Sequence, residues 1–165
     1  MRRVRRWFLV TAATVAALAA AGIGSRAEAQ GRPLNVSGTQ LLNFPTVFPG
    51  LPELVPTSDP VNAGRFSVTG IRNSEVQLTF TLPASLTAPG GYALPLQFGP
   101  GDGAWNTQNT LAAAQAFDPR VPLVTRFSNN GRLFLWLGGT ALPSGTQVSG
   151  IYTGSITLAA AYTGN

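Results

Sequence analysis

The chain has 165 residues, with 11 basic and six acidic side chains and neither histidine nor cysteine. Without cysteine there are no disulfides, thiolate nucleophiles or cysteine-bound metals, and without histidine the commonest general base and metal ligand is missing. All 11 basic residues are arginine, so lysine cannot activate a serine nucleophile either. We therefore predict a protein that is not an enzyme, with no catalytic residues, no cofactor and no metal.

Residues 1–29 follow the three-part pattern of a secretory signal peptide. Four arginines stand before Trp7, residues 7–24 are almost entirely apolar, and Ala27-Glu28-Ala29 places small residues where a signal peptidase cleaves. We predict a signal-peptide helix, cleavage between Ala29 and Gln30, and export to the periplasm, the cell surface or the medium. The alternative is an uncleaved membrane anchor, since the apolar run is close to the shortest spanning length of about 17 residues.

Residues 5–9 (RRWFL) resemble the twin-arginine export signal, R-R-x-F-L. The export route matters because twin-arginine export carries folded proteins, whereas general secretion carries unfolded ones. No cofactor motif calls for folding in the cytoplasm, so we favour general secretion and keep twin-arginine export as the alternative.

Residues 30–165 are predicted to form one domain without a membrane segment. Six arginines and five carboxylates leave this part with a net charge of +1. It has no basic stripe, so we expect no nucleic-acid partner. Proline and glycine recur about every ten residues, which is typical of an all-β sandwich of short strands. We predict about seven to nine antiparallel strands.

In chain order, the first clear strands are residues 65–71 and 75–82. In the second, four apolar side chains alternate with polar ones, which indicates one buried and one exposed face. Residues 92–98 form a third strand, and Pro95 favours an edge position for it.

Residues 99–109 are predicted to be a polar, glycine-rich loop. Trp105 in this loop is a candidate for stacking on a sugar ring, and the alternative is that it packs over the end of the sandwich. Residues 111–117 form the only helix-like stretch, and at two turns it is marginal by itself.

The Asn129-Asn130-Gly131 turn predicts a hairpin, because Asn-Gly tolerates the positive φ angles of a tight turn. This hairpin would join residues 121–127 to residues 132–137. The second of these strands is apolar on both faces, which favours a central position.

Residues 151–162 form the last predicted strand. It places a continuous apolar stripe on one face, and such a stripe must be covered by the domain's second sheet or by another chain. With the glycine that precedes the strand, the stripe makes a candidate assembly strand: Gly150, Tyr152, Gly154, Ile156, Leu158, Ala160 and Tyr162.

This C-terminal pattern resembles the end of chaperone–usher pilus subunits, which close with a glycine, alternating apolar residues and a tyrosine twelve positions later. The resemblance implies an immunoglobulin-like, pilin-like sandwich that lacks its seventh strand. Its partners would be a periplasmic chaperone, an usher and like subunits, bound by β-strand addition.

The chain as a whole resembles a bacterial secreted family, the domain of unknown function four-four-zero-two, which is related to spore coat protein U. The resemblance implies location and fold, but the family carries no assigned function. The segments that carry it are residues 34–37 (LNVS), 42–44 (LNF), 49–50 (PG), 63–70 (AGRFSVTG), 78–83 (LTFTLP), 133–140 (LFLWLGGT) and 150–154 (GIYTG).

The N-terminal segment allows two interpretations. In a pilin, a free extension of alternating apolar residues is donated to the neighbouring subunit, and Leu34, Val36 and Gly38 form a candidate donor segment of this kind. Alternatively, the first strand of the domain begins here. The sequence thus predicts a pilin-like or coat-like surface subunit, and the alternative is a monomeric module for carbohydrate binding or adhesion.

Overall fold

The computed structural model describes residues 33–164, which form twelve antiparallel strands and no helix. The predicted signal peptide and its cleavage site at Ala29 and Gln30 lie outside the described residues. The strands are β1 (Asn35–Gln40), β2 (Glu53–Val55), β3 (Gly64–Thr69), β4 (Glu75–Thr81), β5 (Ser85–Ala88), β6 (Tyr92–Gln97), β7 (Gly103–Asn106), β8 (Gln115–Phe117), β9 (Leu123–Arg126), β10 (Arg132–Leu137), β11 (Gly139–Ala141) and β12 (Thr157–Tyr162).

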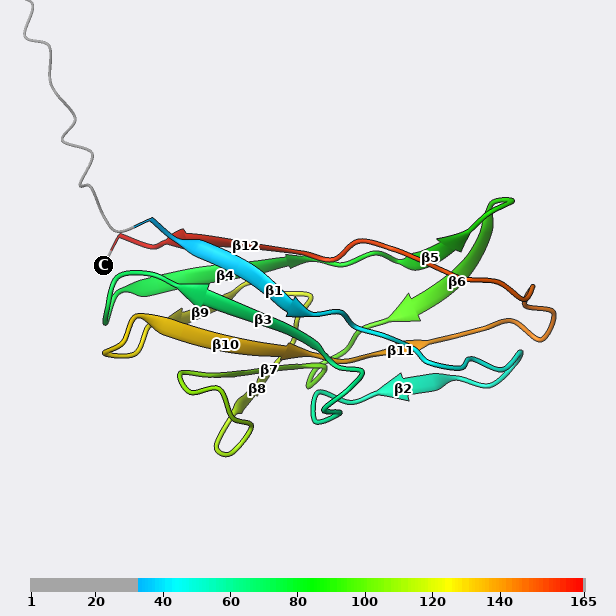
Figure 1. The fold of residues 1–165 in the computed structure, drawn as a ribbon. Coiled ribbons are helices and arrows are strands. Elements are labelled where there is room, and N and C mark those ends of the chain that lie inside the picture. Colours follow the sequence, from blue (N-terminus) through cyan, green and yellow to red (C-terminus); the bar gives the residue numbers. More distant parts are fainter. Residues whose placement is uncertain (1–32, 165) are drawn as a thin grey trace, which may run out of the picture.

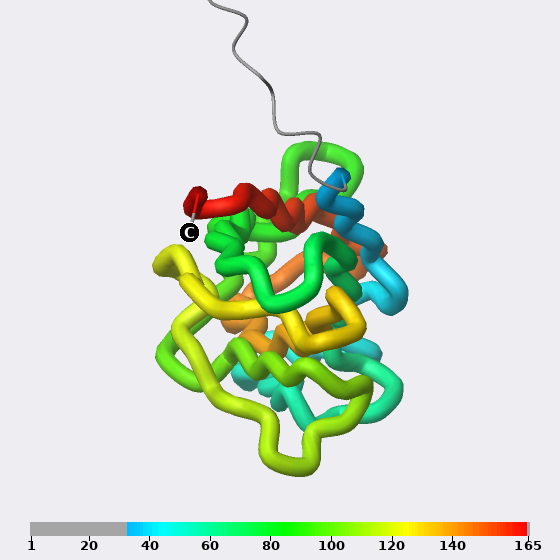
Figure 2. Tube along the Cα trace, turned by 90° about the vertical axis from the view of Figure 1, so that its left-hand side faces the viewer, coloured from blue at the N-terminus to red at the C-terminus, as the bar shows by residue number. Residues whose placement is uncertain are grey.

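The strands are consistent with an elongated β-sandwich (Figure 1). One layer has the order β1-β3-β10-β7-β8, and the layer that packs on it has the order β12-β4-β9. A third sheet, with the order β2-β11-β6-β5, lies at the end of the sandwich away from residues 33 and 164. In this sheet β11 follows β10 of the first layer and β5 follows β4 of the second layer. Strand β6 pairs with both β11 and β5 and so joins the two layers. Viewed from the end in Figure 2, the terminal strands β1 and β12 lie on the same side of the molecule.

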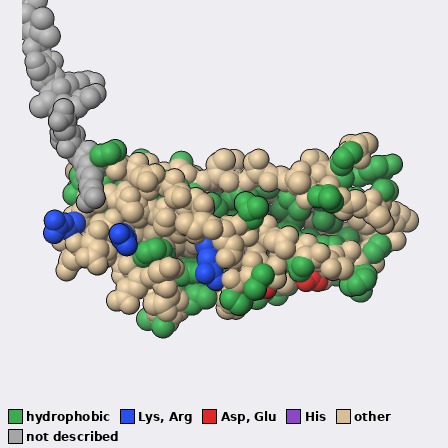
Figure 3. Space-filling view, viewed as in Figure 1, with side chains coloured by type: hydrophobic (Ala, Val, Ile, Leu, Met, Phe, Trp, Pro, Cys, Tyr) green, Lys and Arg blue, Asp and Glu red, His purple; other side chains and the backbone are tan. Residues whose placement is uncertain are grey.

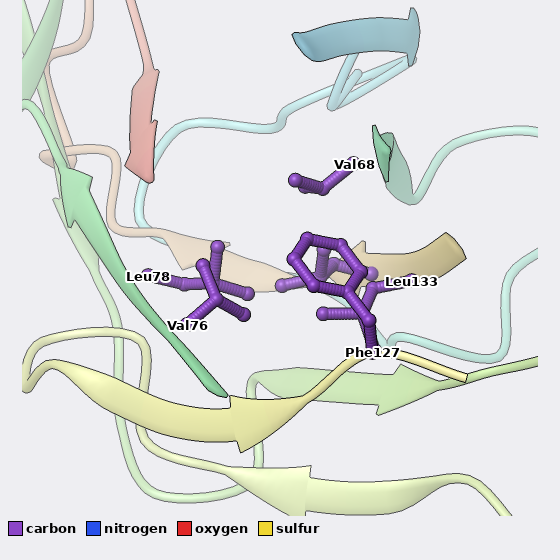
Figure 4. Close-up of a cluster of buried hydrophobic side chains, with 6 residues drawn as sticks. Val68, Val76, Leu78, Phe127 and Leu133 are labelled. Atoms are coloured by element: carbon purple, nitrogen blue, oxygen red, sulfur yellow. The ribbon is translucent and has the colours of Figure 1, made fainter. Parts of the chain in front are cut away.

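The core of the sandwich lies between the two layers. Its fully buried side chains point toward one another from both layers (Figure 4), and they are Val68, Val76, Leu78, Phe127, Leu133 and Leu135. The alternation predicted for residues 75–82 is confirmed, because Val76 and Leu78 are buried while Gln77 between them is exposed. The central position predicted for β10 is also confirmed, since it pairs with β3 on one side and β7 on the other.

The number of strands exceeds the predicted seven to nine for two reasons: two long strands are each divided, and β7 and β8 form where a loop and a helix-like stretch were predicted. Residues 82–84, which include Pro83, separate β4 from β5, and Gly138 separates β10 from β11. A Cβ atom at Gly138 would contact the Val55 carbonyl oxygen, so β2 crosses the backbone closely at this point. The Gly138 amide donates to the carbonyl oxygen of Asp102 (2.8 Å).

The hairpin predicted at residues 129–131 is wrong, although the turn itself is present. The Gly131 amide donates to the Ser128 carbonyl (2.8 Å) and Gly131 has a φ of 66°. However, β9 pairs with β4 and β10 pairs with β3, so the turn crosses from one layer to the other. Phe127 and Leu133 flank the turn and both bury their side chains in the core, which places the two strands opposite each other.

The edge position predicted for the strand at residues 92–98 is wrong as well. In the third sheet β6 lies between β11 and β5. Pro95 lies just past the ladder between β6 and β11, which ends where Ala141 faces Leu96, so the ladder does not use the amide that proline lacks. The Pro95 carbonyl still accepts from the Leu142 amide (2.9 Å).

Strands β7 and β8 replace the predicted loop and helix-like stretch of residues 99–117. Two features bring them together. A Cβ atom at Gly103 would lie 2.6 Å from the Phe117 ring, so glycine lets this ring lie on the strand. The Asn106 side-chain amide donates to the carbonyl oxygens of Thr110 (2.8 Å) and Ala112 (3.0 Å), which holds the connection between the strands. These tertiary contacts override the weak helical pattern.

Candidate functional site

Among the described strands, the C-terminal strand β12 lies at the edge of its layer and pairs only with β4. Leu158, Ala160 and Tyr162 are half-buried and pack against the core, whereas the residues between them are exposed. The ladder is shorter than the predicted strand of residues 151–162, because upstream only Thr153 pairs, with Thr87 of β5.

Two hydrogen bonds show to which side the backbone amides of residues 153–163 point. Thr163 donates to the Glu75 carbonyl (3.4 Å), and Thr153 donates to the Thr87 carbonyl (2.9 Å). Successive amides along an extended strand point to opposite sides. The amides of Ile156, Leu158 and Ala160 therefore point away from β4 and β5, toward the open edge.

Tyr162 anchors the end of this strand. Its hydroxyl oxygen accepts a hydrogen bond from the Ile71 amide (2.7 Å), and its ring centroid lies 6.3 Å from that of Phe127. A Cβ atom at Gly70 would lie 2.7 Å from the Tyr162 oxygen, so the glycine makes room for this contact. The near-terminal tyrosine thus fixes β12 to the turn between β3 and β4.

The candidate donor segment lies within its own domain. Leu34 and Val36 are half-buried against the core, and Gly38 lies over the Phe66 ring. The segment pairs with β3 on one side, and β1 forms the edge of its layer. A donor role for Leu34, Val36 and Gly38 therefore requires their release from β3.

A groove runs along the side of the molecule where the two terminal segments face each other. Its larger part has a volume of about 590 Å³ and a smaller part of about 290 Å³ continues it past Ile156. We call it the seam groove. Residues 38–49 form most of one wall and residues 147–156 most of the other, with Phe66, Leu86 and Leu94 beside them.

Apolar side chains gather in the hollow along this side of the molecule (Figure 3), and several apolar residues of the seam groove are exposed. Leu41 and Ile151 are 85% and 82% exposed, and Val148 is 42% exposed. None of the residues that line the groove is charged. Monomeric proteins seldom leave such apolar strips uncovered unless a partner binds them.

The backbone of the two walls is largely unpaired. Within the described residues, no backbone hydrogen bond joins residues 41–49 to residues 147–156. Tyr152 fixes the second wall through its side chain, because its hydroxyl donates to the Val148 carbonyl (2.6 Å) and accepts from the Gln147 amide group (2.7 Å). Extended backbone that lacks a partner is the feature that lets a sheet edge accept another strand.

Of the predicted assembly residues, Gly150, Tyr152, Gly154 and Ile156 line the seam groove. At Gly154 a Cβ atom would lie 2.8 Å from the Leu86 side chain, so the wall lies directly on β5 there.

The sequence interpretation missed that residues 41–49 form the opposite wall. Their signal is an apolar run interrupted by Pro45 and Pro49, which is extended but cannot form a regular ladder.

Trp105 lies on β7 rather than in a loop. It pairs with Leu135 and Gln115 in the ladders of β10 and β8, and its half-buried side chain packs against the core. The glycan contact therefore stays a prediction, and the strand position gives it no support.

Within residues 33–164, no three His, Cys, Asp or Glu side chains come together in a group suited to a metal ion. The same residues include no helix with the length and apolarity needed to cross a membrane. No model of a known protein family matches the chain, and no curated protein matches it.

Proposed function

We propose that the protein is an exported, non-enzymatic structural subunit of a bacterial surface assembly. It pairs with like subunits by β-strand addition along the seam groove. The observation that carries this proposal is the seam groove itself, in which apolar rims and unpaired extended backbone occur together.

The strand order supports a pilin-like version of the immunoglobulin fold. In that fold the strands A, B, E and D share one layer, while C, F and G share the other. The order β1-β3-β10-β7 corresponds to A-B-E-D, and the pair β12-β4 corresponds to F-C. Strand G would lie along the free edge of β12, where none of the described strands pairs.

The chemistry of the groove indicates the occupant. A neutral, apolar groove favours an uncharged extended segment with alternating apolar side chains. A second copy of the chain carries such a segment at residues 33–40, which would first have to leave β3 of its own domain. A periplasmic chaperone and an usher are the assembly partners that the resemblance to pilus subunits implies.

Charging the groove rim tests the proposal. We expect the double variant Val148→Glu and Ile151→Glu to remain folded, because both side chains are exposed. The glutamates would have to lose water on strand addition, so the concentration needed for assembly should rise by at least about tenfold. Light scattering on the purified protein over a range of concentrations measures this change.

Val61→Glu is the matched control, since Val61 is 71% exposed but does not line the groove. This control should assemble like the wild type. A wild-type protein that stays monomeric at every concentration, or a rim variant that assembles as well as Val61→Glu, would contradict the proposal.

A further inference from the structure

Two turns form a shallow hollow at the end of the sandwich where the described chain begins and ends, at residues 33 and 164. The hollow has a volume of about 440 Å³ and is lined by Arg72, Asn129, Asn130 and Arg132. Arg72 belongs to the turn between β3 and β4, while the asparagines belong to the turn between β9 and β10. We call it the arginine hollow.

The backbone holds the two turns together. The Gly70 amide donates to the Gly131 carbonyl (3.0 Å), and the Asn73 amide donates to the Ser128 carbonyl (3.4 Å). A Cβ atom at Gly131 would overlap the Gly70 carbonyl oxygen, so only glycine permits this approach. The backbone positions of Arg72 and Arg132 are therefore held close to each other.

Among residues 33–164, neither of these two arginines has an acidic partner. In the described part of the chain, neither guanidinium forms an ion pair, and the single ion pair joins Arg120 to Asp118 (2.6 Å). On the face shown in Figure 3, basic side chains stand toward this end of the molecule and acidic ones farther along. Since neither guanidinium has an ion-pair partner among the described residues, the arginine hollow carries two uncompensated positive charges.

We propose that the arginine hollow binds a carboxylate of an acidic saccharide. Guanidinium groups bind planar carboxylates through two parallel hydrogen bonds. The Asn129 and Asn130 carboxamides carry both donors and acceptors, which suits neighbouring hydroxyl groups.

Other anionic partners fit the hollow less well. Nucleic acid binding requires a run of phosphate contacts from several basic residues. An anionic membrane surface is recognised by clusters of about four to eight basic residues. The two arginines and two carboxamides of the hollow are enough to bind one anionic group and the hydroxyl groups next to it. This site is separate from the seam groove and does not depend on the proposed assembly.

Binding of the purified protein to immobilised alginate, a polyuronate, tests the inference. We expect binding to alginate and not to neutral dextran. The double variant Arg72→Gln and Arg132→Gln should weaken binding by at least about tenfold, since each charge-assisted hydrogen bond contributes strongly.

The matched control is the double variant Arg120→Gln and Arg126→Gln, which removes the same charge from exposed positions outside the hollow. It should bind within about threefold of the wild type. Equal binding to alginate and dextran, or an equal loss in both double variants, would overturn the proposal. So would tighter, Arg72- and Arg132-dependent binding to phosphatidylglycerol vesicles, which would indicate a lipid phosphate instead.

Discussion

Replacing Ile156 with proline should strongly weaken assembly while leaving the domain folded. The Ile156 amide points into the seam groove and takes no part in the ladder with β4, so proline removes a hydrogen-bond donor needed only by an incoming strand. The proline ring also obstructs the approach of that strand. We expect the concentration needed for assembly to rise by at least about tenfold, measured by light scattering.

Ile156→Val is the matched control, because it keeps the amide and most of the apolar side chain. It should assemble like the wild type, and Ile156→Ala should give an intermediate result since it keeps only the amide. Thermal unfolding checks that each variant is folded. Normal assembly of a folded Ile156→Pro variant would mean that the contact uses side chains alone, and strand addition at this edge would be wrong.

Replacing Leu135 at the centre of the core with alanine should strongly lower the free energy of unfolding. Leu135 on β10 is fully buried, between Phe66 of β3 and Trp105 of β7 in the ladders. Leu135→Ala would remove three carbons from a rigid central strand and leave a cavity, because such strands relax little. We expect the free energy of unfolding to fall by about 2–5 kcal/mol.

Urea unfolding measures this loss, with Leu54→Ala as the control. Leu54 lies on β2 and is 59% exposed, so its truncation should change the free energy of unfolding by less than about 0.5 kcal/mol. Similar losses in the two variants would mean that β10 is not the centre of the core.

The pattern of apolar and polar residues predicted the strands that bury either one face or both faces. The alternation of residues 75–82 and the two-sided apolar pattern of β10 each correspond to an observed strand with the expected exposure. Both patterns are local, since they depend only on which faces of one strand are covered. The half-burial of Leu158 and Ala160 follows the same rule.

The pattern of a single strand did not predict which other strand or segment lies beside it. The Asn129-Asn130-Gly131 sequence specifies a tight turn, but the layer that the next strand joins depends on where Phe127 and Leu133 find the core. Likewise, the two walls of the seam groove are about 100 residues apart in the sequence, and nothing in residues 41–49 indicates that residues 147–156 face them.

Amide hydrogen exchange tests strand addition most directly, because it reports on the backbone of the open edge itself. In the monomer the outward amides of Ile156 and Leu158 should exchange quickly, whereas the Ala159 amide, which points toward β4, should exchange slowly. On assembly we predict that Ile156 and Leu158 become protected by at least about tenfold. Assembly that leaves these two amides as fast as in the monomer would contradict the account.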